Sequence, residues 1–97
     1  MEELIIYLSE LSVMVVIKIL TSPRCPMCPK AKEVVEKFAK EMKNVSILEL
    51  PVNTEEGFKT ATKFGIKFVP AIIINDEHVI VGVPTLEELR KIVRKYK

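Results

Sequence analysis

The sequence predicts an α/β domain with a four-stranded mixed sheet and helices on both faces, in the order β-α-β-α-β-β-α. Short Val- and Ile-rich segments at 13–20, 44–50 and 68–75 alternate with segments whose apolar residues recur at helical spacing. A single helix separates the first two strands, which predicts a parallel pair joined by a right-handed crossover. A tight turn separates 68–75 from a strand at 78–81, which predicts a hairpin.

The chain has 97 residues, of which 48% are hydrophobic and 29% charged, enough for one domain with its own core. We assign residues 13–97 to that domain and residues 1–12 to an N-terminal extension.

A net charge of +2 is too small for a nucleic-acid-binding protein. Glu2 and Glu3 stand where a signal peptide would be positively charged, and 13–20 is too short to cross a bilayer. We therefore expect a cytoplasmic monomer that binds neither nucleic acid nor membrane. The chain contains no Gln and many Lys and Glu, a composition that is typical of thermophilic proteins.

Each predicted helix has recognisable ends. The first covers about residues 28–43, and its inner face carries Ala31, Val34, Val35, Phe38, Ala39 and Met42. The second follows a cap at Asn53 or Thr54 and ends at Gly65. Its inward residues are expected to be Phe58, Ala61 and Phe64. The third opens with a capping box at 85–88 and runs to about Tyr96.

Pro70 lies near the start of the third strand, where a missing N–H does least harm. The turn into the fourth strand is formed by the segment NDEH, at 75–78.

Residues 1–12 fit two structures. Leu4, Leu8 and Leu11 suit an amphipathic helix, while the segment at 5–7 suits an edge strand.

Both cysteines lie between the first strand and the first helix, in the segment TSPRCPMCPK. A thiol attacks a disulfide only as the thiolate, so such a site must stabilise negative charge on sulfur. Cys25 precedes a helix whose first N–H groups can face its sulfur, and Arg24 and Lys30 add positive charge. In such settings a thiol pKa falls from about 8.5 to roughly 3.5–7.5.

The prolines around the cysteines stiffen the loop. Pro23 restricts the chain before Cys25, and Pro26 suits an early helical position. Pro29 has no N–H to donate, which leaves the amides of Met27 and Cys28 as the expected thiolate donors. The soft apolar side chain of Met27 is expected to face a binding partner.

Two other interpretations of the cysteine pair remain open. A structural disulfide would close a four-residue ring and stabilise the fold by only about 2 kcal/mol. A C-x-x-C pair is also half of a zinc site, and His78 is the only histidine in the chain. A metal-binding or redox-sensing module would therefore have to share zinc or an iron–sulfur cluster between two chains. We predict no metal site within one chain, and we expect His78 to be exposed beside the turn.

The motifs around these residues resemble the thioredoxin and glutaredoxin superfamily. CPMC stands between a buried strand and a helix, KFGIKFVPAIIIN resembles the family's cis-proline motif, and HVIVGVPTLEEL resembles its closing strand and helix. TSPRCPMCPKA most resembles one unit of the protein disulfide oxidoreductases of hyperthermophiles and their small single-domain relatives. The resemblance covers about residues 13–97 and implies a thioredoxin fold.

The resemblance also implies a function and roles for individual residues. Cys25 would be the attacking thiol and Cys28 the resolving thiol, with Pro70 as a cis-proline beside them. The backbone of Val69 would pair with an extended substrate segment, and Pro26 and Met27 would also contact it. The protein would then be a thiol–disulfide oxidoreductase that needs no cofactor beyond its redox-active disulfide. Its partners would be protein disulfides and a disulfide reductase; the alternative is a glutaredoxin-like reductase that uses a small thiol.

Three positions depart from these families. Arg24 stands where thioredoxins carry a Trp, and Ile19 stands where they keep a buried Asp that accepts a proton. Deprotonation of Cys28 must therefore use water or another carboxylate. The segment 82–85 lacks the Gly-Gly-acidic pattern with which glutaredoxins hold glutathione.

Overall fold

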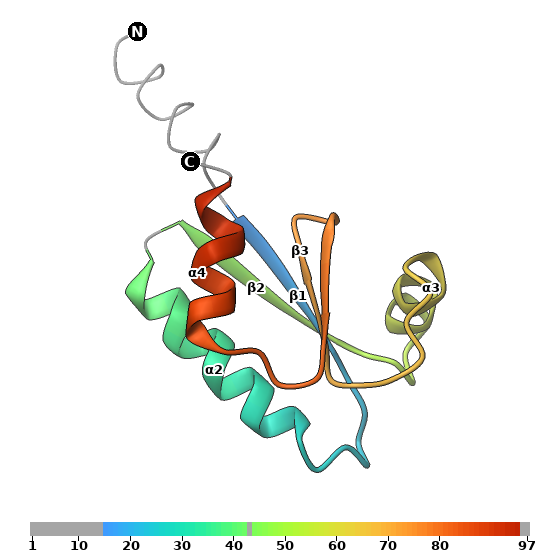
Figure 1. Ribbon diagram of the computed structural model, residues 1–97. Helices are drawn as coiled ribbons and strands as arrows, with labels where there is room; N and C mark the ends of the chain where they lie inside the picture. Colours follow the sequence, from blue (N-terminus) through green and yellow to red (C-terminus); the bar gives the residue numbers. More distant parts are fainter. Residues whose placement is uncertain (1–14, 43, 96–97) are drawn as a thin grey trace, which may run out of the picture.

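The computed structural model describes residues 15–42 and 44–95, and these form a four-stranded sheet in the order β2-β1-β3-β4 (Figure 1). The elements are β1 (Val15–Thr21), α2 (Cys28–Glu41), β2 (Val45–Pro51), α3 (Glu55–Lys63), β3 (Ala71–Ile74), β4 (His78–Val81) and α4 (Leu86–Arg94). β1 is parallel to β2 and antiparallel to β3, which is antiparallel to β4. The predicted order and topology are confirmed. The expectations for residues 1–12 and for a helix end at Tyr96 lie outside the described residues.

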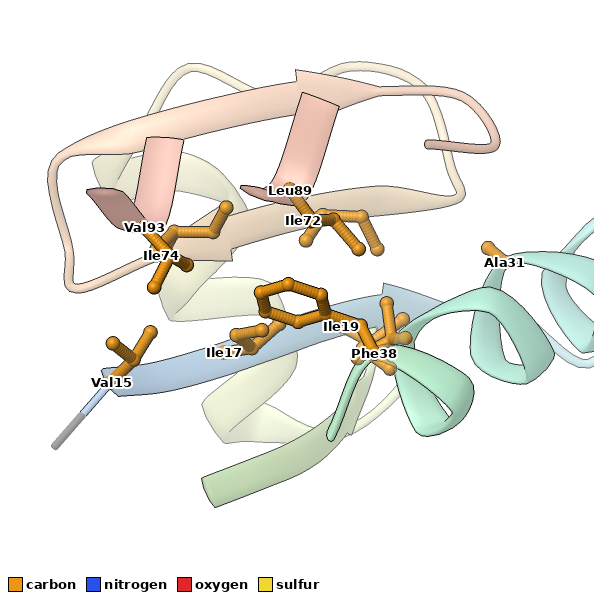
Figure 2. Close-up of a cluster of buried hydrophobic side chains, with 10 residues drawn as sticks. Val15, Ile17, Ile19, Ala31, Phe38, Ile72, Ile74, Leu89 and Val93 are labelled. Carbon is orange, nitrogen blue, oxygen red and sulfur yellow. The ribbon is translucent and has the colours of Figure 1, made fainter. Parts of the chain in front are cut away.

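Helices α2 and α4 lie on one face of the sheet and α3 lies on the other (Figure 1). Because β1 and β3 are central strands, successive residues on them enter two different cores. The core under α2 and α4 contains Val15, Ile17, Ile19, Ala31, Val35, Phe38, Ile72, Ile74, Leu89 and Val93 (Figure 2). The core on the α3 side contains Leu20, Leu50, Ala71 and Ile73. None of the helices in the described part of the chain has the length and apolar character needed to span a membrane.

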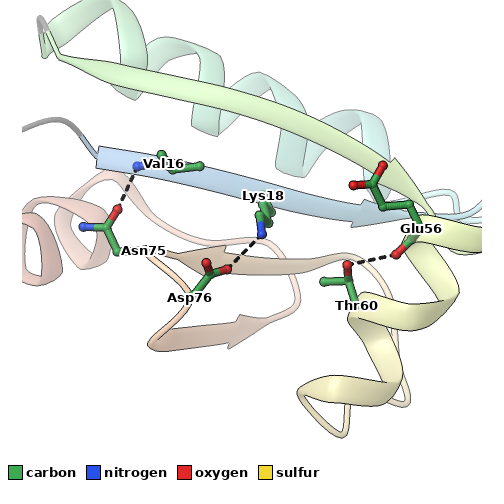
Figure 3. A network of polar contacts seen from close by, with 6 residues as sticks. All are labelled: Val16, Lys18, Glu56, Thr60, Asn75 and Asp76. Atoms are coloured by element: carbon green, nitrogen blue, oxygen red, sulfur yellow. Dashed lines mark hydrogen bonds and ion pairs between the residues drawn. The ribbon is translucent and has the colours of Figure 1, made fainter. Parts of the chain in front are cut away.

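The β3–β4 turn is tied to β1 by two side chains (Figure 3). Asn75 and Asp76 have φ of 51° and 56°, a region that these two residue types tolerate better than most. The Asn75 side-chain oxygen accepts a hydrogen bond from the Val16 amide at 2.8 Å, and Lys18 Nζ lies 2.9 Å from Asp76 Oδ1. The turn therefore fixes the hairpin against the neighbouring strand.

The helix starts agree with the sequence patterns. Thr54, rather than Asn53, is the N-cap of α3, and its hydroxyl accepts a hydrogen bond from the Gly57 amide at 3.1 Å. Thr85 and Glu88 form the predicted capping box of α4. Gly65 follows α3 with φ of 64°, the left-handed conformation that favours glycine after a helix.

The predicted inner face of α3 is wrong by one residue. Phe58 is 65% exposed, while Gly57 is buried and Ala61 and Phe64 are half-buried. The inward positions are thus 57, 61 and 64, because α3 meets the end of β2 at its glycine. Hydrophobic spacing alone could not identify this face, since its first member has no side chain.

We expect Gly57→Ala to destabilise the protein. A Cβ at this position would overlap the carbonyl oxygen of Pro51, so α3 would have to shift away from β2. The expected loss of unfolding free energy is about 1–3 kcal/mol, measured by guanidinium titration of the oxidised protein. Helix propensity alone predicts the opposite, a gain of about 1 kcal/mol. Lys59→Ala, at an exposed position of the same helix, is the control and should change stability by about 0.5 kcal/mol or less.

Candidate active site

The two cysteines form a disulfide where β1 passes into α2. Their Cα atoms are 5.4 Å apart, and the Cys25 amide donates a hydrogen bond to the Ser22 carbonyl at 3.1 Å. Cys28 is the first residue of α2 and is only 4% exposed, whereas Cys25 is half-buried. Cys25 is therefore partly accessible to solvent, whereas Cys28 is buried.

The start of α2 is open to an anion. Its N-cap residue Met27 makes no side-chain capping bond, and the first turn contains no acidic residue. The partial positive charge of the helix N-terminus is therefore not neutralised from within the helix, which favours a thiolate at Cys25. The structure corrects one expectation: Pro26 lies in the turn before α2 instead of in its first turn, and Pro29 occupies the second helical position.

A shallow pocket of about 380 Å³ joins the cysteine loop to the loop before β3. We call it the Val69 pocket, and it is lined by Ser22, Arg24, Cys25, Pro26, Met27, Lys67, Phe68 and Val69. The Val69–Pro70 peptide bond is cis, and the buried Pro70 accepts a hydrogen bond from the Gly82 amide at 2.8 Å. Five of the site residues predicted from the sequence therefore line this pocket: Arg24, Cys25, Pro26, Met27 and Val69. Lys30 does not; it is exposed on α2, outside the lining residues.

An apolar surface continues from the Val69 pocket toward α3. A second pocket of about 460 Å³, the α3 pocket, shares Ser22, Lys67 and Val69 with the first. Its other lining residues are Val52, Phe58, Ala61, Thr62, Gly65 and Ile66. Phe68, which is 72% exposed, and Met27, which is 46% exposed, both line the Val69 pocket.

A third pocket, of about 490 Å³, contains both cysteines and is charged. We call it the Glu49 pocket, and it is lined by Thr21, Ser22, Pro23, Cys25, Cys28, Pro29, Lys32, Glu36, Glu49 and Pro51. Glu49 Oε1 lies 2.9 Å from Lys32 Nζ, and Glu49 Oε2 accepts a hydrogen bond from the Thr21 hydroxyl at 3.2 Å. The hydrogen bond to Lys32 lowers the pKa of Glu49 below 4.5, and the same contact raises the pKa of Lys32 above 10.5. Both groups are therefore charged at neutral pH.

Comparison with known proteins agrees with this geometry. Residues 15–94 match the family model described as a thioredoxin domain. The chain belongs to the thioredoxin family. It is 57% identical over 84 residues to a probable thioredoxin of Archaeoglobus fulgidus, covering 87% of this chain and 91% of the relative. It is 42% identical over 79 residues to a thioredoxin of Methanocaldococcus jannaschii, covering 81% of this chain and 92% of the relative.

Solved structures show the same fold at low sequence identity. Fasciola hepatica thioredoxin superposes with a TM-score of 0.70 at 19% identity, over 99% of this chain and 93% of that one. A mutant thioredoxin of Halobacterium salinarum gives 0.69 at 20% identity, over 91% and 80%. The predicted thioredoxin fold is confirmed. Family membership together with the Cys25–Cys28 disulfide identifies the chain as a thiol–disulfide oxidoreductase.

Three residues of the site were not predicted from the sequence. The sequence pattern predicts a strand at Phe68, but β3 begins only at Ala71 and Phe68 lines the Val69 pocket. Lys32 and Glu49 meet only after the helix and strand pack, so no local motif joins them. One signal was present for Glu49: it follows Val45 and Ile47 in the inward register of the second strand, where a charge is unusual.

The described residues of the chain include no group of three or more His, Cys, Asp or Glu side chains that could hold a metal ion. The disulfide itself is the redox-active group that the structure contains.

Proposed function

We propose that Cys25 attacks protein disulfides and that Cys28 resolves the resulting mixed disulfide. The Cys25 thiolate attacks one substrate sulfur, and the other substrate sulfur leaves as a thiolate. The Cys28 thiolate then attacks Cys25 Sγ, which releases the second substrate thiolate and forms the Cys25–Cys28 disulfide. The substrate gains two electrons and the protein loses two. The observation that carries the proposal is the asymmetry of the pair, an accessible Cys25 joined to a Cys28 that is 4% exposed.

The surface around Cys25 supports a protein substrate over a small thiol. Met27 and Phe68 present exposed apolar area beside Cys25, and the α3 pocket extends this area. Exposed apolar patches of this kind mark protein-binding surfaces. An extended substrate segment would pair with the backbone of Val69, with Pro26 and Met27 against its side chains.

Turnover then requires a donor of electrons. We propose that a disulfide reductase reduces the Cys25–Cys28 disulfide and that no cofactor is involved beyond this pair. In this proposal the protein acts as a cytoplasmic monomer. Arg24, which lines the Val69 pocket, and Lys30, in the first turn of α2, would lower the pKa of the Cys25 thiol.

The proposal is tested by alkylating the reduced protein with iodoacetamide, in the presence of a chelator, across a range of pH. We expect Cys25 to react with an apparent pKa at least one unit below the free value of about 8.5, because the α2 N-terminus stabilises its thiolate. The rate for Cys28 should be at most about one tenth of the rate for Cys25, since Cys28 is buried. Peptide mapping by mass spectrometry separates the two rates.

Arg24→Gln and Lys30→Gln serve as paired controls, since each removes one positive charge without touching a cysteine. Either change should raise the apparent pKa of Cys25 if that charge tunes it. Equal rates and ordinary pKa values for both cysteines would contradict the exchange mechanism. Reaction only after metal has been removed would instead favour a metal-binding function.

A further inference from the structure

The second half of the proposed reaction needs a base. Cys28 must lose its proton before it attacks Cys25, yet it is 4% exposed, and burial in apolar surroundings raises a thiol pKa. On the core face of β1, Ile19 is buried among apolar side chains and cannot accept a proton. The acceptor must therefore lie in a pocket that reaches Cys28.

The Glu49 pocket contains Cys28 and two carboxylates, those of Glu36 and Glu49. Glu49 is the register partner of Ile19 in the parallel β1–β2 ladder, so its side chain points to the same face of the sheet, under α2. Thr21, a buried residue of β1, and Lys32, on α2, each hold one oxygen of this carboxylate. Both carboxylates are exposed, and the ion pair with Lys32 and the hydrogen bond from Thr21 distinguish Glu49 from Glu36. Glu49 is thus the carboxylate that the fold holds in place.

We propose that Glu49 accepts the proton of Cys28 through water in the Glu49 pocket when Cys28 resolves the mixed disulfide. This inference rests on the proposed function. The proton moves from Cys28 Sγ to the Glu49 carboxylate, and the Cys28 thiolate attacks Cys25 Sγ. The Cys25–substrate bond breaks and the substrate leaves as a thiolate, which recovers a proton from Glu49 or from solvent. Lys32 and Thr21 are positioning residues.

Charge and space in the pocket are consistent with this role. The charged groups that face Glu49 are Lys32 and Glu36 on α2, and the Thr21 hydroxyl faces it from β1. Since Lys32 lowers the pKa of Glu49, the carboxylate is ionised throughout the neutral range and can accept a proton there. A volume of about 490 Å³, lined in part by the polar side chains of Lys32, Glu36 and Glu49, has room for bridging water molecules. A carboxylate of low pKa is a weak base, so its contribution should fall at the lower end of general-base effects.

The test is a stopped-flow reaction of the fully reduced protein with 5,5′-dithiobis(2-nitrobenzoate). Attack by Cys25 releases the first thionitrobenzoate, and resolution by Cys28 releases the second at a rate independent of reagent concentration. For Glu49→Gln we expect the second phase to slow by about 10- to 100-fold at pH 7, with the first phase nearly unchanged. Glu36→Gln, which removes the other carboxylate of the same pocket, is the matched control and should leave both phases nearly unchanged.

The pH dependence separates proton transfer from a structural effect. With Glu49 present, the second phase should be flat from about pH 5 to 8, because the acceptor is ionised and the thiol protonated throughout. In Glu49→Gln it should rise about tenfold per pH unit, following the Cys28 thiolate alone, and added formate should restore part of the rate. In Lys32→Met, which keeps the carboxylate, the lower limit of the flat region should move to higher pH.

An unchanged second phase in Glu49→Gln overturns the inference, as does equal slowing in Glu49→Gln and Glu36→Gln. If Glu49→Gln does not fold, a flat region that stays in place in Lys32→Met overturns it independently. A wild-type protein without a rapid first phase overturns the proposed function itself, and this inference with it.

Discussion

Replacing Cys25 with serine is expected to abolish protein disulfide reduction, lowering the rate by on the order of 10³-fold or more. A serine hydroxyl at neutral pH is not ionised and cannot replace the thiolate that begins the exchange. Cys28 should not substitute for it, because it is 4% exposed, whereas Cys25 lines the Val69 pocket. The measurement is the reduction of insulin disulfides, followed by turbidity, with dithiothreitol as the electron donor.

Cys28→Ser should fail in a different way. Cys25 can still attack, so a mixed disulfide forms and persists because no second thiol resolves it. Mass spectrometry of the protein after reaction with limiting substrate should show a covalent adduct for Cys28→Ser and none for Cys25→Ser. Ser22→Ala, beside the cysteines in the same loop, should keep most of the activity. Adducts in Cys25→Ser but not in Cys28→Ser would reverse the two roles.

The topology of the sheet could be predicted because it depends on local patterns. One helix between two apolar strands leaves little alternative to a parallel crossover, and Asn75 and Asp76 belong to the few residue types that accept the observed turn. The caps at Thr54 and Thr85 depend on residues within one turn of the cap. Such features need no knowledge of what packs against them.

The parts that escaped prediction depend on contacts between distant elements. The inner face of α3 is set by Gly57 against Pro51, a close approach that requires the absence of a side chain, so hydrophobic spacing selected Phe58 instead. Pairing of Lys32 with Glu49 depends on the position of α2 over β2. Neither the helix nor the strand specifies this position by itself.

The residues of the active site also fall into two groups, those within short sequence motifs and those brought together by the fold. The cysteine pair and the cis peptide bond before Pro70 belong to short motifs, and the sequence was enough to select them. The Glu49 pocket is built from β1, the cysteine loop, α2 and β2, and only the fold brings β2 to the other segments. With Ile19 in place of an acid, the sequence indicated that Cys28 must use water or another carboxylate. The parallel register places Glu49, the acceptor that we propose, beside Ile19.

The second large effect concerns the core that holds α2 in place. Phe38 is fully buried and lies among Ile17, Ile19, Ile72 and Leu89, where β1, β3 and α4 meet α2 (Figure 2). We expect Phe38→Ala to lower the free energy of unfolding by about 3–5 kcal/mol, because the removed ring leaves a cavity that these elements cannot fill. The measurement is a guanidinium titration of the oxidised protein.

Phe58→Ala is the matched control for this prediction, since it makes the same substitution on another helix at a position that is 65% exposed. It should cost about 1 kcal/mol or less, because little apolar area is removed from the interior. Its effect should appear instead in substrate binding, as a higher KM for insulin, because Phe58 lines the α3 pocket. Equal destabilisation by the two substitutions would contradict the assignment of Phe38 to the core and of Phe58 to the surface. The pair therefore separates the aromatic side chain that fixes α2, and with it Cys28, from the one available to a partner.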